Sequence, residues 1–64
     1  MNIPKGTRIK LIRMPDDPQP IPAGTIGTVK ACSDFGDWAQ LQVQWDNGRH
    51  LMLCVPPDQF EIVD

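Results

Sequence analysis

The chain has 64 residues, of which 41% are hydrophobic and 22% charged, and its formal net charge at pH 7 is −2, all ordinary for a globular domain. This length allows a single domain over residues 1–64 and excludes a second one. It also limits the core, because a chain of about 60 residues buries only about 60% of the surface that its unfolded form exposes. Self-association is therefore an expected source of further stability.

The N-terminal residues 1–6 lack the apolar run of a signal peptide. No stretch reaches the roughly 18 apolar residues of a membrane span, so we expect a cytoplasmic protein. The two cysteines, Cys32 and Cys54, are fewer than a small secreted domain usually carries. We expect both to be reduced and to lie in or near the core as small hydrophobic residues, with a disulfide and a metal role as the less favoured alternatives.

The first predicted strand covers residues 8–13, where Ile9 and Leu11 alternate with Arg8 and Lys10. This alternation predicts one buried face and one basic face in water. Residues 14–23 follow with four prolines, which cannot donate to a strand ladder and favour extended geometry in the residue before them. We expect a long, ordered, proline-rich loop after the first strand.

Residues 24–32 predict the second strand, in which Ile26 and Val29 are three positions apart. A plain period of two cannot bury both, so Gly27 between them is expected to form a bulge or a sharp bend. A bend of this kind lets one strand serve two parts of a small barrel. Residues 33–37 then predict a polar turn.

Residues 40–53 give the clearest pattern in the chain, a β-hairpin closed by Asp46-Asn47-Gly48, since Asn and Gly tolerate the positive φ values of a hairpin loop. Before the turn, glutamines alternate with apolar residues, and the alternation resumes after it. The residues expected on the core face of the hairpin are Leu41, Val43, Trp45, Leu51 and Leu53. The residues expected on its outer face are Gln42, Gln44, His50, Met52 and Cys54.

Residues 56–60 are too short for a helix and predict a short 3₁₀ turn, and residues 61–63 predict a last short strand. Five short strands with these connections predict an all-β fold. The order of elements indicates a small five-stranded SH3-like barrel.

Four segments resemble a family of small bacterial and phage proteins known only as a domain of unknown function with an SH3-like fold. They are Gly-Thr-Arg-Ile at 6–9, Pro-Asp-Asp-Pro at 15–18, Ile-Pro-Ala-Gly-Thr-Ile-Gly-Thr-Val at 21–29 and Val-Gln-Trp-Asp-Asn-Gly-Arg at 43–49. The resemblance covers about residues 5–63. It implies the fold and no established activity.

Two more distant resemblances concern function. Residues 24–29 resemble the glycine-centred strand of KOW-type barrels, which occur in ribosomal and transcription proteins. The overall size is similar to that of the plasmid-borne trimethoprim-resistant dihydrofolate reductase, a tetramer of SH3-like barrels with a Val-Gln-Ile-Tyr run in its active pore. Residues 50–53 read His-Leu-Met-Leu at that place, without the glutamine or the tyrosine, and so argue against reductase activity.

No constellation of residues predicts catalysis, a cofactor or a metal site. His50 and Cys54 share a strand face, but a zinc site needs three or four ligands, and Cys32 would have to come alongside. Ser33 has no glycine-rich elbow, and the chain has one histidine to serve as a base. Two pairs of carboxylates, Asp16 with Asp17 and Asp34 with Asp37, are typical of solvated loops. We therefore expect a protein that is not an enzyme.

Protein binding is the function that the sequence favours. SH3-like barrels that recognise peptides use the long loop after the first strand together with exposed aromatic residues. The apolar residues expected to be exposed, Ile12, Met52 and Trp38, would equally suit an interface between copies of the chain. Trp38 has a second interpretation, as a partly buried cover for the open end of the barrel. The candidate protein-binding residues are Met14, Asp16, Asp17, Phe35 and Trp38.

The alternative is a KOW-like nucleic-acid-binding module, in which the basic first strand contacts phosphates. Four of the six basic residues lie within nine positions, and Phe35 and Trp38 could stack on bases. The acidic balance argues against it, because phosphate contacts supply most non-specific affinity. The candidate residues for this function are Lys5, Arg8, Lys10 and Arg13.

Overall fold

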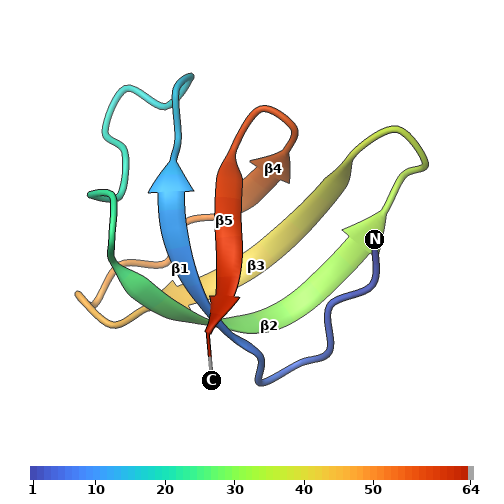
Figure 1. The fold of residues 1–64 in the computed structure, drawn as a ribbon, viewed down its shortest axis with the longest axis horizontal. Coiled ribbons are helices and arrows are strands. Elements are labelled where there is room, and N and C mark those ends of the chain that lie inside the picture. Colours follow the sequence, from blue (N-terminus) through green and yellow to red (C-terminus); the bar gives the residue numbers. More distant parts are fainter. Residues whose placement is uncertain (64) are drawn as a thin grey trace.

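The computed structural model describes residues 1–63 and contains five strands in one antiparallel sheet (Figure 1). Their bounds are β1 Arg8–Arg13, β2 Ile26–Asp34, β3 Ala39–Trp45, β4 Leu53–Val55 and β5 Gln59–Val63. The predicted all-β fold with five strands is confirmed, and the first strand has the predicted bounds. Within residues 1–63 no helix is long and apolar enough to cross a membrane.

The strand order is β4-β3-β2-β1-β5, with β4 and β5 as the two edges of the sheet. β2 pairs with β1 near its start and with β3 along its length, so the sheet curls around the core (Figure 1). No pairing joins β4 to β5 within the described residues, so the sheet is not closed and the predicted SH3-like barrel is not confirmed. β4 is short because Pro56 and Pro57 follow it, and proline has no N–H to donate to a ladder.

A β-bulge in β2 lies at Lys30, between the pairs Val29–Val43 and Ala31–Gln42. The extra residue returns the chain to the core face at Cys32, which stands opposite Leu41. The predicted irregularity in this strand is therefore real, but its predicted place at Gly27 is wrong. Gly27 and Val29 follow a plain period of two, both buried, and Ile26 is only partly covered.

Gly27 has a different role, since it stands in one row with Ile9 on β1 and Trp45 on β3. A Cβ at Gly27 would lie 2.7 Å from Trp45 Cε3 and 2.7 Å from Val43 Cγ1. The absence of a side chain lets the indole lie flat against the backbone of β2.

The predicted turn at residues 46–48 is present. Trp45 N–H donates to Arg49 O at 2.9 Å, and Gly48 has a φ of 91°. A three-residue loop whose last residue is left-handed is a common hairpin connection. Asn47 keeps a negative φ and contributes through its side chain, which accepts the Arg49 N–H at 3.1 Å.

The strand that returns from this turn is interrupted, whereas the alternating pattern predicted a continuous one. Gln44 forms an isolated bridge with His50, and regular pairing resumes only at Leu41–Leu53. The reason is Trp45, whose Nε1–H donates to Leu51 O at 3.0 Å and draws that carbonyl to the indole.

The connection from β4 to β5 is closed by Asp58, which is buried. Its N–H donates to Cys54 O at 3.0 Å, and its carboxylate Oδ2 accepts the Cys54 N–H at 3.0 Å. A hydrogen bond from residue i+4 to residue i defines an α-turn, so the predicted 3₁₀ turn is not confirmed here.

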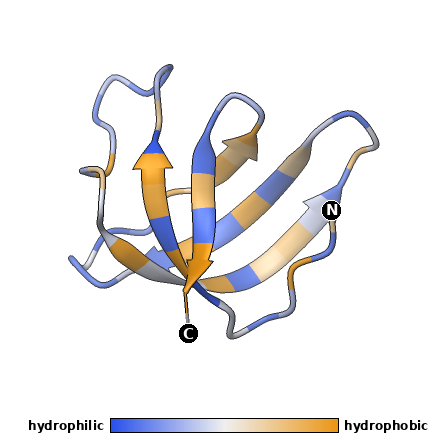
Figure 2. Ribbon diagram, in the orientation of Figure 1, coloured by the Kyte–Doolittle hydropathy of each residue, from blue (hydrophilic) through white to orange (hydrophobic). Residues whose placement is uncertain are grey.

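The core lies inside the curl of the sheet and follows the alternation of β1, β3 and β4 (Figure 2). Met14 and Ile21, at the two ends of the proline-containing connection between β1 and β2, are buried in it as well. Gly24 N–H donates to Leu11 O at 2.8 Å and holds the end of that connection against β1. The ten buried hydrophobic residues are Ile9, Leu11, Met14, Ile21, Val29, Ala39, Leu41, Val43, Trp45 and Leu53.

Candidate functional site

Phe35 and Trp38 form an aromatic pair on the hairpin between β2 and β3. Their ring centroids are 4.4 Å apart with 19° between the planes, and they remain 52% and 41% exposed. The pair closes a tight turn, in which Phe35 N–H donates to Trp38 O at 2.9 Å and Gly36 has a φ of 85°. Trp38 is thus a half-covered surface residue held in place by a stacking partner.

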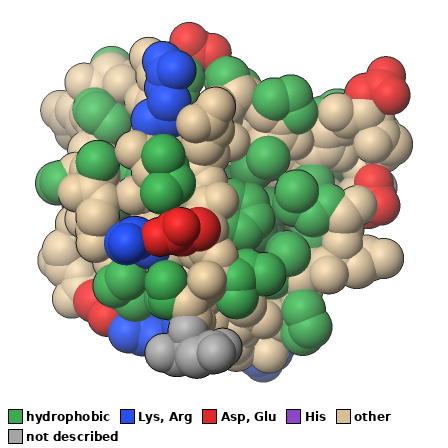
Figure 3. Space-filling model, in the orientation of Figure 1, with side chains coloured by type: hydrophobic (Ala, Val, Ile, Leu, Met, Phe, Trp, Pro, Cys, Tyr) green, Lys and Arg blue, Asp and Glu red, His purple; other side chains and the backbone are tan. Residues whose placement is uncertain are grey.

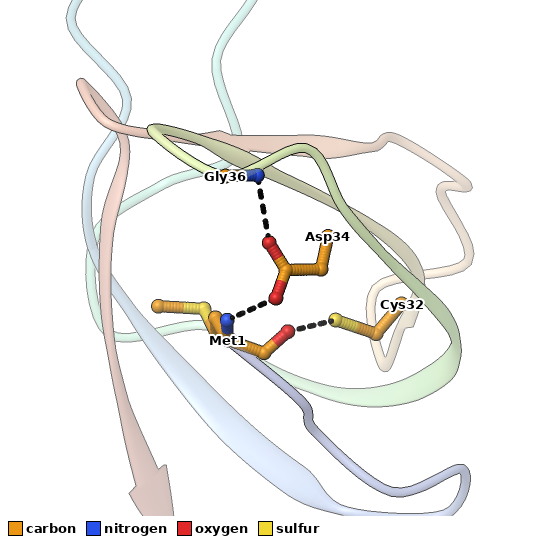
Figure 4. A network of polar contacts seen from close by, with 4 residues as sticks. All are labelled: Met1, Cys32, Asp34 and Gly36. Carbon is orange, nitrogen blue, oxygen red and sulfur yellow. Dashed lines mark hydrogen bonds and ion pairs between the residues drawn. The ribbon is translucent and has the colours of Figure 1, made fainter.

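The base of this hairpin is tied to the N-terminus (Figure 4). Asp34 Oδ2 accepts a hydrogen bond from the Met1 ammonium at 2.8 Å, and Oδ1 accepts the Gly36 N–H at 2.9 Å. The ammonium first, and the Gly36 N–H second, lower the pKa of the Asp34 carboxyl, and Asp34 raises the pKa of the Met1 amine. Cys32 Sγ approaches Met1 O at 3.4 Å.

A hollow of about 170 Å³, the aromatic groove, lies beside Trp38. Its walls come from the N-terminus, the β2–β3 hairpin and the end of β4. Its lining residues are Met1, Gly36, Asp37, Trp38, Ala39, Val55 and Pro56.

Asp16 and Asp17 line a second hollow of about 250 Å³, the acidic groove. The Asp17 carboxylate accepts the Gln19 N–H at 2.8 Å, which fixes the loop locally. Met14 does not face this groove, because it is 6% exposed and packs in the core. The lining residues of the acidic groove are Asp16, Asp17, Pro18, Met52, Cys54, Pro57 and Asp58.

The β4–β5 turn stands between the two grooves, with Pro56 in the aromatic groove and Pro57 in the acidic groove. The proline-containing loop, this turn and the β2–β3 hairpin all lie at the same end of the molecule (Figure 1). We call this end the rim. It brings together four of the five candidate protein-binding residues and leaves out Met14.

Two of the four basic candidates are already paired with carboxylates. Arg8 donates to both oxygens of Asp46, at 2.9 and 2.6 Å, and also to Thr28 Oγ1 at 2.8 Å. Asp46 raises the pKa of Arg8, and Arg8 lowers the pKa of Asp46. Lys10 Nζ lies 2.7 Å from Glu61 Oε1.

The other two basic candidates, Lys5 and Arg13, are exposed and make no ion pair within residues 1–63. Lys5 lies before β1 and Arg13 is its last residue. The first strand therefore does not present a row of four unneutralised cations.

The residues considered for a metal do not assemble. Cys32 stands opposite Leu41 on the core face, and Cys54 stands opposite Gln40 on the other face. Both thiols are free and partly covered, and Cys32 packs against the core as expected of a small hydrophobic residue. No group of three His, Cys, Asp or Glu side chains in residues 1–63 is placed to hold a metal ion.

A third hollow, of about 340 Å³, lies over the interrupted pairing of β3 with the segment before β4. We call it the ladder groove. Its lining residues are Lys30, Gln42, Val43, His50, Leu51 and Met52. The sequence did not predict it, because the alternation of residues 50–55 indicates an unbroken strand.

Hydrophobic side chains also gather on the open side of the sheet, next to β5 (Figure 3). Ile62 stands opposite Ile9 on the core face and is nevertheless 57% exposed, because β5 is an edge strand. Ile12 and Met52 are exposed, as the sequence predicted.

The family model described as a domain of unknown function, DUF4314, matches residues 1–63. No curated protein matches the chain. No solved structure matches it either.

Proposed function

The chain belongs to the DUF4314 family of unknown function, and we propose that it is a non-catalytic binding module that holds a protein partner, or a second copy of itself, at the rim. The observation that carries this proposal is the position of the stacked Phe35–Trp38 pair beside a groove, next to a second groove with two aspartates. Exposed aromatic anchors flanked by polar loops are typical of protein-binding surfaces.

The arrangement of the loops supports this function. The three segments of the rim come from distant parts of the sequence, and each is held in place by a buried residue or a hydrogen bond. Ile21 packs in the core and holds the proline-containing loop, Asp58 holds the β4–β5 turn, and Asp34 holds the β2–β3 hairpin. A surface held in this way loses little conformational entropy on binding. The carboxylates of Asp16 and Asp17 favour a partner with basic residues.

We also propose that the open sheet is a variant of the SH3-like architecture. Two features support it: a bent β2 that pairs with strands on both sides, and the long connection between β1 and β2. The shared fold by itself implies no shared function.

The proposal is tested with peptides selected from a random library on the immobilised protein, with binding measured by calorimetry. Trp38→Ala should abolish binding, and Asp16→Asn/Asp17→Asn should weaken the binding of basic peptides. Ile62→Ala, which removes an exposed apolar side chain near the C-terminal end of β5 and away from the rim (Figure 1), is the matched control. Peptides that bind the wild type and the Trp38→Ala variant equally would contradict the proposal.

Self-association is tested by light scattering across a concentration series. If copies of the chain meet at the rim, Phe35→Ala and Trp38→Ala should shift the mass to that of a monomer. A dimer that survives both substitutions would place the interface elsewhere, for example on the open side next to β5.

Nucleic-acid binding is the second candidate, and Lys5 and Arg13 are the observation that favours it, since both are exposed and unpaired within residues 1–63. A salt titration with labelled single- and double-stranded DNA and RNA distinguishes the two functions. Tight binding that falls steeply with salt and is lost in Lys5→Ala/Arg13→Ala would favour this candidate over protein binding.

A further inference from the structure

The two edges of the sheet differ in how their outward backbone groups are used. On β4, Cys54 N–H donates to Asp58 Oδ2 and Cys54 O accepts the Asp58 N–H, both at 3.0 Å. The polar groups of Cys54 that point away from β3 are therefore satisfied by the turn that follows. β5 has β1 on one side and, within residues 1–63, no paired strand on the other (Figure 1).

The direction of the backbone groups of β5 follows from those of β1. Leu11 uses its backbone on the side of β2, since its N–H donates to Thr25 O at 2.9 Å and its carbonyl accepts the Gly24 N–H at 2.8 Å. The polar groups of successive residues in an antiparallel ladder point to alternate sides. Those of Lys10 therefore point to β5, where Lys10 pairs with Glu61.

Phe60 and Ile62, the two neighbours of Glu61, point away from β1 by the same alternation. Their N–H and C=O groups make no hydrogen bond on that side within residues 1–63. Their side chains lie on the core face, opposite Leu11 and Ile9, and Ile62 is 57% exposed. The free edge of β5 thus combines two unpaired donors and two unpaired acceptors with the apolar surface of the open side (Figure 3).

This free edge is complementary to itself. If a second β5 runs antiparallel about a two-fold axis at Glu61, Phe60 of each copy stands opposite Ile62 of the other. These are the two residues with unpaired backbone groups, so the register pairs all four groups of each copy. On the core face, it also places each Phe60 ring beside an Ile62 side chain. An interface of this kind uses the same patch on both copies, as closed two-fold dimers do.

The charges on the outer face allow the same register. Glu61 stands opposite Glu61 of the other copy, and like charges directly opposite each other destabilise a sheet. Each carboxylate is held by a cation, however, because Lys10 Nζ lies 2.7 Å from Glu61 Oε1. The row across the two copies then contains two lysines outside and two glutamates inside, and its net charge is zero.

We propose that two copies of the chain associate through the free edges of β5, in an antiparallel pairing centred on Glu61. The sheet of one copy continues into the sheet of the other, and the exposed Ile62 side chains are covered. A chain of this length buries a limited core by itself, and the added burial compensates for that. The proposal does not depend on the function proposed for the rim.

Light scattering across a concentration series tests the association, and amide hydrogen exchange locates it. The mass should rise from 7.2 kDa toward twice that value. The Phe60 and Ile62 amides should then exchange at least about tenfold more slowly, whereas the Glu61 amide, which is already paired with β1, should change little. A chain that stays monomeric, or a dimer whose Phe60 and Ile62 amides stay unprotected, would overturn the proposal.

Two substitutions of Ile62 separate its backbone from its side chain. Ile62→Ala and Ile62→Pro both remove the apolar side chain, but only proline removes the N–H, which takes no part in the β1–β5 ladder. Ile62→Pro should weaken association at least about tenfold relative to Ile62→Ala, because two hydrogen bonds are lost in each dimer. Circular dichroism verifies that both variants are folded. Equal association of the two folded variants would overturn the proposal.

Lys10→Gln gives a second test, which leaves the backbone of β5 unchanged. It leaves the two Glu61 carboxylates opposite each other without a cation, so association should weaken at least about threefold. Lys5→Gln, which removes an exposed lysine before β1, is the matched control and should have no effect. Association that is the same in Lys10→Gln and in the wild type would show that the register is wrong.

Association at the rim gives a different result. Trp38→Ala would then shift the mass to that of a monomer, and the Phe60 and Ile62 amides would stay unprotected in the wild-type dimer, which would overturn the proposal. In the dimer proposed here, Trp38→Ala leaves the mass unchanged. If the chain forms this dimer but no peptide binds at the rim, only the function proposed for the rim is wrong.

Discussion

Gly27 and Trp45 lie in direct contact across two paired strands, with only 2.7 Å between Trp45 Cε3 and the place where a Cβ of residue 27 would be. This is closer than two carbon atoms can approach without a shift of the ring or of the strand. Because Trp45 is 1% exposed and also holds Leu51, the ring has little room to move.

Gly27→Ala should therefore lower the free energy of unfolding by about 1–3 kcal/mol, the usual cost of overpacking a core. Gly27→Val should cost more, because two further methyl groups meet Trp45 and Val43. The measurement is chemical denaturation, with Lys30→Ala on the same strand as a control that stays within about 0.5 kcal/mol of the wild type. A neutral Gly27→Ala would mean that the indole does not lie against β2.

Trp45→Phe separates the two roles of the indole. Phenylalanine keeps most of the buried ring but has no N–H to donate to Leu51 O. We expect a loss of roughly 1–3 kcal/mol for the freed carbonyl and the smaller ring, against about 3–5 kcal/mol for Trp45→Ala. Thermal melting gives the stabilities.

The NMR signals of Leu51 and Met52 give a second readout for Trp45→Phe. If the indole causes the gap in the ladder, they should move toward regular strand shifts as residues 51 and 52 become free to pair with β3. Unchanged signals would mean that the gap has another cause.

The alternation of apolar residues predicted the five strands, and for β1 it predicted the bounds. It failed where side chains compete with the backbone pairing of a strand. Residues 50–55 alternate without a break, yet the Trp45 indole takes the Leu51 carbonyl and divides the strand. No glycine or proline marks the bulge at Lys30, so its position could not be predicted from the sequence. The bulge brings Cys32 back to the core face.

The candidate site was predictable only in part. Phe35, Trp38, Asp16 and Asp17 could be named from the sequence because exposed aromatic residues and a long loop are local signals. Their arrangement on either side of Pro56 and Pro57 could not, since it depends on contacts between loops far apart in the chain. Met14 illustrates the limit: it begins the loop, but the bend of the chain turns it into the core.

Acid should weaken the Arg8–Asp46 pair. The pKa of Asp46 is lowered in the folded protein by the guanidinium, so the pair contributes stability above the ordinary aspartate value of 3.8 and loses it as the pH falls through the lower folded value. Both side chains are about half exposed, which keeps the effect small. Asp46→Asn should make the denaturation midpoint less dependent on pH between about pH 6 and about pH 2.

The same comparison at high salt is the control for this pair. Salt screens exposed charges, so the difference between wild type and Asp46→Asn should shrink. An Asp46→Asn variant with an unchanged pH dependence would mean that the pair does not persist in solution.

The β4–β5 turn should depend on Asp58, whose buried carboxylate accepts the Cys54 N–H at 3.0 Å. Asp58→Ala leaves that N–H without its acceptor and should cost about 1–3 kcal/mol. Asp58→Asn keeps an acceptor oxygen and should cost clearly less, and Asp37→Ala, an exposed aspartate on the β2–β3 hairpin, should cost little. Because Pro56 and Pro57 of this turn separate the two grooves of the rim, Asp58→Ala should also weaken peptides selected on the rim while the protein is still folded. Full affinity in a folded Asp58→Ala protein would mean that the turn does not shape the binding surface.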